Sequence, residues 1–148
     1  MPELIVLCGV SHAGKTTYAK QINKSNKYKI INTDNIRIKL HGDRKIKNDE
    51  PVVWKEFDKQ KNDAINNHEN VILDACHLSS QARWHAKKYI NGHDTKIVVF
   101  NTSKKELKKR WKKENKRIDW KIIEDMYSNF SISKDKLQYE GFNNIIFI

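Results

Sequence analysis

Short apolar runs alternate along the chain with longer segments of helical spacing. Runs of this kind are typical of buried strands, whereas apolar positions three and four apart are typical of helices. The apolar runs predict strands at Glu3–Cys8, Lys29–Asn32, Val71–Asp74, Lys96–Phe100 and Asn144–Ile148. The helical spacing predicts helices over Lys15–Asn23, Asp34–Leu40, about Pro51–His68, from a Ser79 or Ser80 cap to about Ile90, from a Ser103 cap to about Asn115, and from an Asp119 cap to about Phe130.

Strands separated by helices need crossover connections, which are typical of a mostly parallel sheet. We therefore predict an α/β fold in one domain over residues 1–148, with a five-stranded, mostly parallel sheet flanked by helices. Ligand sites in such folds lie at the carboxyl ends of the strands. The residues that follow each predicted strand are therefore the candidates for chemistry.

Composition excludes several other classes of protein. No apolar run approaches the ~18–20 residues of a membrane span, and the N-terminal residues lack the basic segment of a signal peptide. Two cysteines do not make a disulfide scaffold or a structural zinc site. We expect a cytoplasmic domain, lying in the host cytoplasm if the chain is encoded by a phage.

The net charge of +11 has two interpretations. A basic domain attracts partners that carry phosphate. However, 24 of the 29 basic residues are lysine, and lysine, asparagine and isoleucine codons are rich in A and T. Genomic bias could therefore account for part of the charge, and the five arginines are the more informative cations.

A phosphate-binding loop is the strongest motif. Residues 9–16 read Gly-Val-Ser-His-Ala-Gly-Lys-Thr, between a predicted strand and a predicted helix. In such a loop backbone N–H groups converge on phosphate oxygens, Lys15 reaches the β- and γ-phosphates, and Thr16 is a magnesium ligand. The residues expected to bind the nucleotide here are Gly9, Ser11, His12, Ala13, Gly14, Lys15, Thr16 and Thr17.

Asp34 and Arg37 follow the second predicted strand and lie one helical turn apart. Asp34 could accept the proton of an attacking hydroxyl, and Arg37 could hold an acceptor phosphate through two hydrogen bonds. The alternative is that Asp34 only caps the helix, for which aspartate is favoured. Both roles could fall to the same residue.

The third predicted strand ends at Asp74, which resembles the carboxylate that positions Mg²⁺ in nucleotide-binding sites. Cys76 and His77 come next, and Arg83 follows on the adjacent helix. We expect these last three residues to contact the acceptor. The alternative for Asp74 is a polar cap of its strand, and the alternative for His77 is an ordinary loop histidine.

Residues 103–118 form a very basic segment whose apolar stripe is narrow, with Leu107 and Trp111 as its members. This pattern predicts a loosely docked helical lid, within which Arg110 and Arg117 are candidates to contact the nucleotide, and Arg110 to assist catalysis. The alternative is a solvated face enriched in lysine by codon bias.

Over almost its whole length, the chain resembles the kinase domain of bacteriophage 5′-polynucleotide kinases. The resemblance is carried by the loop Gly9–Thr16, by the D-x-x-R of Asp34 and Arg37, by Arg110, and by the closing helix with Ile122-Ile123-Glu124-Asp125-Met126-Tyr127. It implies a P-loop kinase fold, with ATP and Mg²⁺ as cofactors, Asp34 as general base and Arg37 on the 3′-phosphate of the acceptor.

The resemblance therefore implies a kinase of the 5′-hydroxyl ends of DNA or RNA, acting in nucleic acid repair. The sequence departs from the family after the third strand, where Cys76 and His77 replace the usual threonine and asparagine. A related kinase of another alcohol, such as a hydroxymethylated base in DNA or a nucleoside, is the alternative. A nucleotide-dependent switch is disfavoured because it needs no base such as Asp34. The sequence leaves the oligomeric state open.

Overall fold

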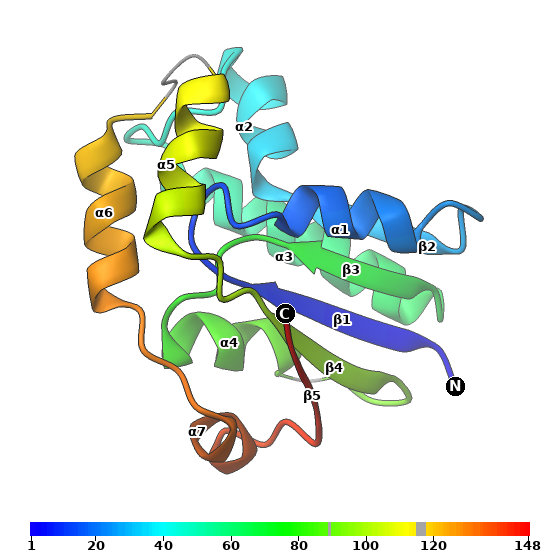
Figure 1. The fold of residues 1–148 in the computed structure, drawn as a ribbon. Coiled ribbons are helices and arrows are strands. Elements are labelled where there is room, and N and C mark those ends of the chain that lie inside the picture. Colours follow the sequence, from blue (N-terminus) through cyan, green and yellow to red (C-terminus); the bar gives the residue numbers. More distant parts are fainter. Residues whose placement is uncertain (89, 115–117) are drawn as a thin grey trace.

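A parallel sheet forms the centre of the fold (Figure 1). The computed structural model describes residues 1–88, 90–114 and 118–148. The strands are β1 (Glu3–Cys8), β2 (Tyr28–Asn32), β3 (Asn70–Asp74), β4 (Asp94–Val99) and β5 (Asn144–Phe147). They lie in the order β2-β3-β1-β4-β5, and each neighbouring pair is parallel. The predicted α/β fold with a five-stranded parallel sheet is confirmed.

Helices cover both faces of this sheet, as a buried parallel sheet requires. Figure 1 shows α1 and α5 in front of the sheet and α3 and α4 behind it. The helices are α1 (Lys15–Ile22), α2 (Thr33–His41), α3 (Glu50–Asn66), α4 (Ser80–Lys87), α5 (Lys104–Lys113), α6 (Trp120–Asn129) and α7 (Lys134–Tyr139). In the part of the chain that the structure describes, no helix is both long and apolar enough to cross a membrane.

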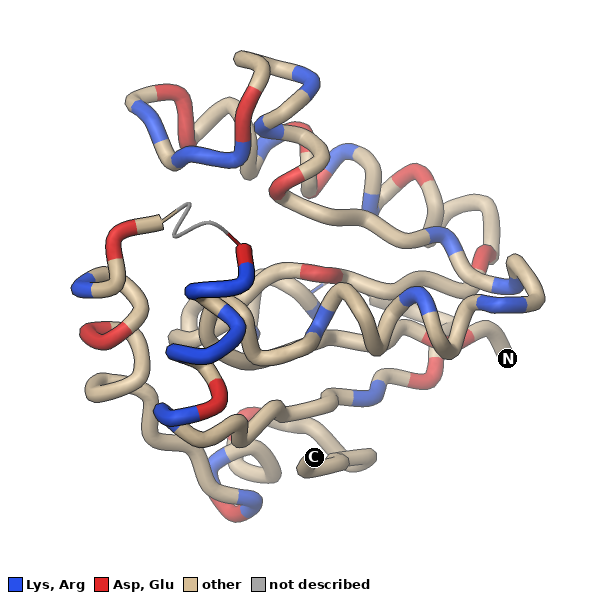
Figure 2. Tube along the Cα trace, turned by 45° about the horizontal axis from the view of Figure 1, so that its top comes forward, with Lys and Arg blue, Asp and Glu red and all other residues tan. Residues whose placement is uncertain are grey.

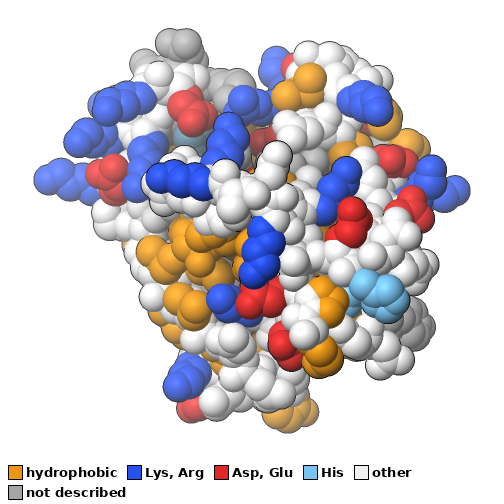
Figure 3. Space-filling view, turned by 90° about the vertical axis from the view of Figure 1, so that its right-hand side faces the viewer, with side chains coloured by type: hydrophobic (Ala, Val, Ile, Leu, Met, Phe, Trp, Pro, Cys, Tyr) orange, Lys and Arg blue, Asp and Glu red, His pale blue; other side chains and the backbone are white. Residues whose placement is uncertain are grey.

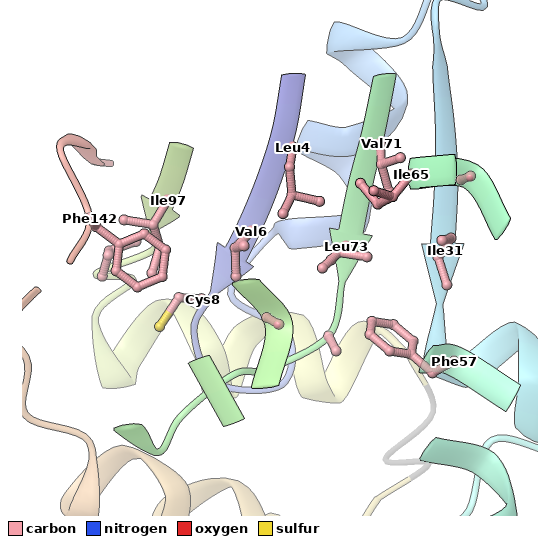
Figure 4. Close-up of a cluster of buried hydrophobic side chains, with 14 of the residues drawn as sticks. Leu4, Val6, Cys8, Ile31, Phe57, Ile65, Val71, Leu73, Ile97 and Phe142 are labelled. Atoms are coloured by element: carbon pink, nitrogen blue, oxygen red, sulfur yellow. The ribbon is translucent and has the colours of Figure 1, made fainter. Parts of the chain in front are cut away.

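The central strand β1 supplies both halves of the core. Successive side chains of a strand point to opposite faces. Leu4 and Val6 therefore pack in one cluster with Phe57 of α3 (Figure 4), whereas Ile5 packs in the other cluster with Leu107 of α5. Because β1 is buried on both sides, the loop that follows it has a rigid base.

Most differences between the predicted and observed elements lie at their ends. Helix α7 is an exception, because the sequence does not predict it. It has six residues, of which Leu137 is buried, so it offers no helical repeat of apolar positions. Helix α2 starts at Thr33, one residue earlier than predicted, because the Asn32 side chain accepts a hydrogen bond from the backbone N–H of Asn35.

Candidate functional site

The phosphate loop connects β1 to α1. Gly14 has a φ of 105°, which favours glycine. A Cβ on Gly9 would lie 3.0 Å from Cβ of Phe100, so the close approach of these two segments also needs glycine. The Lys15 ammonium is buried in the loop and donates to the carbonyl oxygens of Gly9 (2.9 Å) and Val10 (2.7 Å). A charged group therefore sits inside the ring of backbone that would surround a phosphate.

Thr16 and Asp74, the two predicted magnesium ligands, lie side by side. Thr16 Oγ1 donates to Asp74 Oδ2 at 2.8 Å, and Asn32 Nδ2 donates to the same oxygen at 2.6 Å. Among the described residues, no group of three or more His, Cys, Asp and Glu side chains could hold a metal by itself. A hydroxyl and one carboxylate suit Mg²⁺, which usually takes its other ligands from phosphates and water.

Asp34 and Arg37 are also in contact, and Glu50 joins them from α3. Arg37 Nη1 donates to Asp34 Oδ1 at 3.0 Å. Its Nε and Nη2 donate to the two carboxylate oxygens of Glu50 at 3.0 and 2.7 Å. Burial alone would lower the pKa of Arg37, but the hydrogen bonds and charges of Glu50 and Asp34 raise it above its usual value. The guanidinium is therefore held charged beside a half-exposed Asp34 carboxylate.

Asp34 does not cap α2, because Asn32 holds that position. The alternative interpretation of Asp34 as a helix cap is therefore wrong. Asp34 lies in the first turn instead, where a carboxylate still interacts favourably with the positive end of the helix dipole. Within the described residues, no hydrogen-bond donor contacts its second oxygen, Oδ2.

One large cleft contains both groups of residues. It has a volume of about 1790 Å³ and is bounded by the phosphate loop, by α2 and the start of α3, by the loop after β3, and by α5 and α6. Ligand pockets for one small molecule have volumes of roughly 300–1,000 Å³. The cleft therefore has room for a nucleotide and for a second ligand next to Asp34.

Helix α5 lies over the phosphate loop. Arg110 Nη1 donates to the carbonyl oxygen of His12 at 3.0 Å and lies 3.3 Å from where a Cβ on Gly14 would be. Arg110 Nε donates to Glu106 on its own helix at 3.2 Å. The structure thus brings the predicted arginine to the loop, whereas Arg117, the other candidate, lies outside the described residues.

Arg83 and His77 are both buried, contrary to the exposure that an acceptor contact needs: Arg83 is not among the residues that line the cleft, and His77 lines it but is only 2% exposed. Arg83 is 1% exposed. Its five N–H groups are matched by Glu140, Ser80 and the carbonyl oxygens of His77 and Leu78. With every donor occupied by the protein, this arginine holds α4 and the loop before it in place.

His77 is also a buried residue. Its Nδ1 lies 2.7 Å from the carbonyl oxygen of Leu7, and its ring packs against Trp54 and Phe57. Burial lowers the pKa of His77 to about 4, so the ring is neutral near pH 7. The preceding residue, Cys76, is half-buried at the edge of the cleft, as a contact to an acceptor requires.

Sequence reasoning missed several residues of the cleft. Asn32 orients the carboxylate of Asp74, and Glu50 orients the guanidinium of Arg37. Nothing in the local sequence distinguishes Asn32 or Glu50 from ordinary residues at helix ends. Arg44 and Lys45 line the acceptor side from the segment between α2 and α3. Trp54 lines the cleft as well and packs edge-on against Phe57.

Comparison with known proteins connects this geometry to a family. A sequence profile described as an AAA domain matches residues 4–131. No curated protein matches the sequence significantly. Two solved structures of the Pnkp1/Rnl/Hen1 complex contain similar chains. The first has 27% identity and a TM-score of 0.67, over 74% of this chain and 38% of that chain.

The second structure is described as an RNA repair complex, with 25% identity and a TM-score of 0.78 over 91% of this chain and 46% of that chain. The chain therefore spans less than half the length of these two proteins. A gluconokinase from Sinorhizobium meliloti 1021 has 18% identity and a TM-score of 0.68, over 99% of this chain and 82% of that chain. These structures share a P-loop kinase-like fold with this chain, and they do not bear on a bacteriophage origin.

Proposed function

Because the chain belongs to the AAA domain family matched above, we propose that it is an ATP-dependent kinase of the 5′-hydroxyl ends of DNA or RNA. The observation that carries this proposal is the Asp34–Arg37 pair, which lines the same cleft as the phosphate loop. A nucleotide switch needs the loop alone. A kinase also needs a base and a group that holds the acceptor.

The residues of the cleft suit the steps of such a transfer. Asp34 accepts the proton of the 5′-hydroxyl while the hydroxyl oxygen forms a bond to the γ-phosphorus of ATP. The bond from that phosphorus to the bridging oxygen of ADP breaks, and ADP leaves with the electron pair. Lys15 supplies positive charge to the transferring group, and Arg110 adds a second cation that contacts the loop at the carbonyl oxygen of His12.

Thr16 and Asp74 are the residues that would hold Mg²⁺. When bound, the ion neutralises charge on the β- and γ-phosphates. Asn32 fixes the Asp74 carboxylate through its 2.6 Å hydrogen bond. This side chain thus orients the acid and caps α2 at the same time.

Charge supports a nucleic acid as the acceptor. Figure 2 shows basic positions on α5 and on the segment between α2 and α3, both at the same end of the molecule. Arg44 and Lys45 from one segment and Arg110 and Lys113 from the other line the cleft. The similarity to chains of an RNA repair complex is consistent with this acceptor. In this proposal α5 serves as the lid.

A panel of acceptors with labelled ATP tests the proposal. The panel contains 5′-hydroxyl DNA, 5′-hydroxyl RNA, a nucleoside 3′-phosphate, a nucleoside, DNA with a hydroxymethylated base, and gluconate. We expect transfer to the first three acceptors, and a loss of turnover by a factor of about 10²–10⁴ in Lys15→Ala. Arg37→Ala should raise KM for the nucleoside 3′-phosphate and leave KM for ATP nearly unchanged.

One observation favours the second candidate, a kinase of an alcohol without a 3′-phosphate. Glu50 occupies two of the five N–H groups of Arg37, and Asp34 occupies a third. A phosphate would have to bind the two that remain or displace Glu50. If the wild-type protein phosphorylates a nucleoside as efficiently as its 3′-phosphate, the second candidate is correct.

A further inference from the structure

His12 connects the phosphate loop to α5 in two ways. Its φ of 68° lies in the left-handed region, which residues with a side chain seldom adopt. In this conformation the carbonyl oxygen of His12 accepts the hydrogen bond from Arg110 Nη1. Its side chain, 2% exposed, meets the end of the same helix at Glu114.

Both nitrogens of the His12 ring have a polar partner. Nε2 lies 3.0 Å from Glu114 Oε2, and Nδ1 lies 2.9 Å from Ser11 Oγ. The Ser11 contact has the geometry of a hydrogen bond, whereas the Nε2–Glu114 contact is a close polar contact whose angle is not that of a hydrogen bond. The Ser11 hydroxyl and the Glu114 carboxylate therefore fix the orientation of the ring together.

The charged residues of α5 that line the cleft beside the phosphate loop form one stripe along the helix. Glu106, Arg110 and Glu114 are each four residues apart, so they share a helix face, and all three line the cleft. Arg110 is 39% exposed and its second partner, Glu106, is on its own helix. Those contacts attach the middle of α5 to the loop, in addition to the packing of Leu107 and Trp111 against the rest of the fold.

We propose that His12 and Glu114 are positioning residues that hold α5 against the phosphate loop and so set the place of Arg110 over the nucleotide. The Glu114 contact lies one turn beyond Arg110, so that the end of the helix has its own polar contact with the loop. This inference rests on the nucleotide-binding part of the proposed function and is independent of the acceptor.

The test measures two quantities in a set of variants. One is the affinity for a non-hydrolysable ATP analogue with Mg²⁺, by calorimetry, and the other is kcat/KM for ATP. Glu114→Ala should lower both by up to about tenfold, because it removes the polar group beside a buried ring nitrogen. Glu114→Gln should recover most of the loss, because its amide oxygen can take the place of Oε2 beside Nε2. His12→Asn, which tolerates a positive φ, should match Glu114→Ala, and the double variant should be no worse.

Arg110→Ala separates positioning from a direct role. If Glu114 acts through Arg110, Glu114→Ala should cause no further loss in the Arg110→Ala background. Glu124→Ala is the control, because it removes an acidic residue that pairs with Lys104 at 2.9 Å on the far side of α5; we expect it to match wild type. Unchanged values in Glu114→Ala, or equal losses with and without Arg110, would overturn the proposal. If the proposed acceptor is incorrect, the calorimetric affinities still test the role of His12 and Glu114, because they are measured without an acceptor.

Discussion

Arg37 illustrates how much of the site depends on single side chains. The guanidinium bridges two carboxylates from different helices, Asp34 in α2 and Glu50 in α3. A fork-to-fork contact of this type is stronger and more directional than a single hydrogen bond. Asp34 is therefore held in one place by a residue that is itself fixed, which is the arrangement a general base requires.

Asp34→Asn should abolish turnover without unfolding the protein. The amide keeps the shape of the side chain but cannot accept the proton, and Asn32 rather than Asp34 caps α2. We expect a loss in kcat of at least about 10²-fold, with an unchanged Tm and unchanged affinity for an ATP analogue. The matched variant, Asn32→Ala, should lower Tm. A parallel loss of Tm and kcat in Asp34→Asn would contradict a role as base.

His77 should destabilise the fold in mild acid. Burial lowers its pKa from 6.5 to about 4, so between these values the unfolded chain binds a proton that the folded chain does not. The free energy of unfolding should therefore fall by about 3 kcal/mol as the pH drops from 6.5 to 4. Urea titrations across this range measure the effect.

His77→Asn is the control for this titration, because asparagine tolerates the φ of 48° and does not titrate. The variant has a lower stability at pH 7, but its slope between pH 6.5 and 4 should be shallower than that of wild type. Identical slopes would show that His77 already carries a proton in the folded protein.

At the scale of elements, α5 differs most from what its sequence predicts. Its narrow apolar stripe predicts loose docking, yet Leu107 is fully buried and Trp111 packs against Trp120 of α6 with ring centroids 5.5 Å apart. Polar contacts to the loop add to this packing. The partners of these polar contacts lie in the phosphate loop, about 100 residues away in sequence. The spacing of residues within α5 therefore could not predict them.

The lysines of α5 have different surroundings. Lys108 lies 5.1 Å above the ring of Trp120, Lys104 pairs with Glu124, and Lys113 lines the cleft. Lys105, Lys109 and Lys112 are exposed. Figure 3 shows basic side chains projecting at the upper left of the face drawn there.

Replacing Lys105, Lys109 and Lys112 by Gln should weaken binding of a long single strand and flatten its salt dependence. Each phosphate contact contributes a slope of about −0.7 in log K against log salt, so three lost contacts change the slope by about 2. A mononucleotide acceptor should show no change. The matched control removes equal charge elsewhere, with Gln at Lys24, Lys29 and Lys59. If the α5 variant keeps the wild-type slope, these lysines reflect codon bias.

At the scale of the whole molecule, one ion pair joins segments distant in sequence. Arg83 of α4 bonds through Nε and Nη2 to both oxygens of Glu140, which follows α7. The hydrogen bond from Arg83 lowers the pKa of Glu140 against the opposing effect of burial. The pair fixes the chain just before β5, so the edge of the sheet depends on it.

Glu140→Ala should lower the free energy of unfolding by about 3 kcal/mol, because it leaves the Arg83 charge buried without its partner. Glu140→Gln, which keeps one acceptor oxygen, should lose less. Chemical denaturation measures both losses. The affinity for an ATP analogue should remain at the wild-type value under conditions where the variants are folded. A rise in acceptor KM without a loss of stability would restore Arg83 as a substrate contact.

The sequence determines the sheet and the phosphate loop well and the acceptor side poorly. The strands and Gly9–Thr16 are encoded by contiguous residues, so local pattern is enough to predict them. Contacts such as Arg37–Glu50 and Arg83–Glu140 join residues 13 and 57 positions apart. Their pairing depends on how α2, α3, α4 and α7 pack, which no local spacing contains. For this reason the sequence predicts Arg83 at the acceptor, whereas the structure buries it against Glu140.

The position of β1 in the sheet also has a consequence for the order of folding. β1 pairs with residues 71–73 on one side and 94–99 on the other. Both neighbours of the strand that leads into the phosphate loop are therefore distant in sequence, and β4 is the more distant of the two. Their pairing closes long loops, which slows folding. Nucleotide affinity should thus arise late in refolding, when β4 joins β1, although the loop residues are contiguous in sequence.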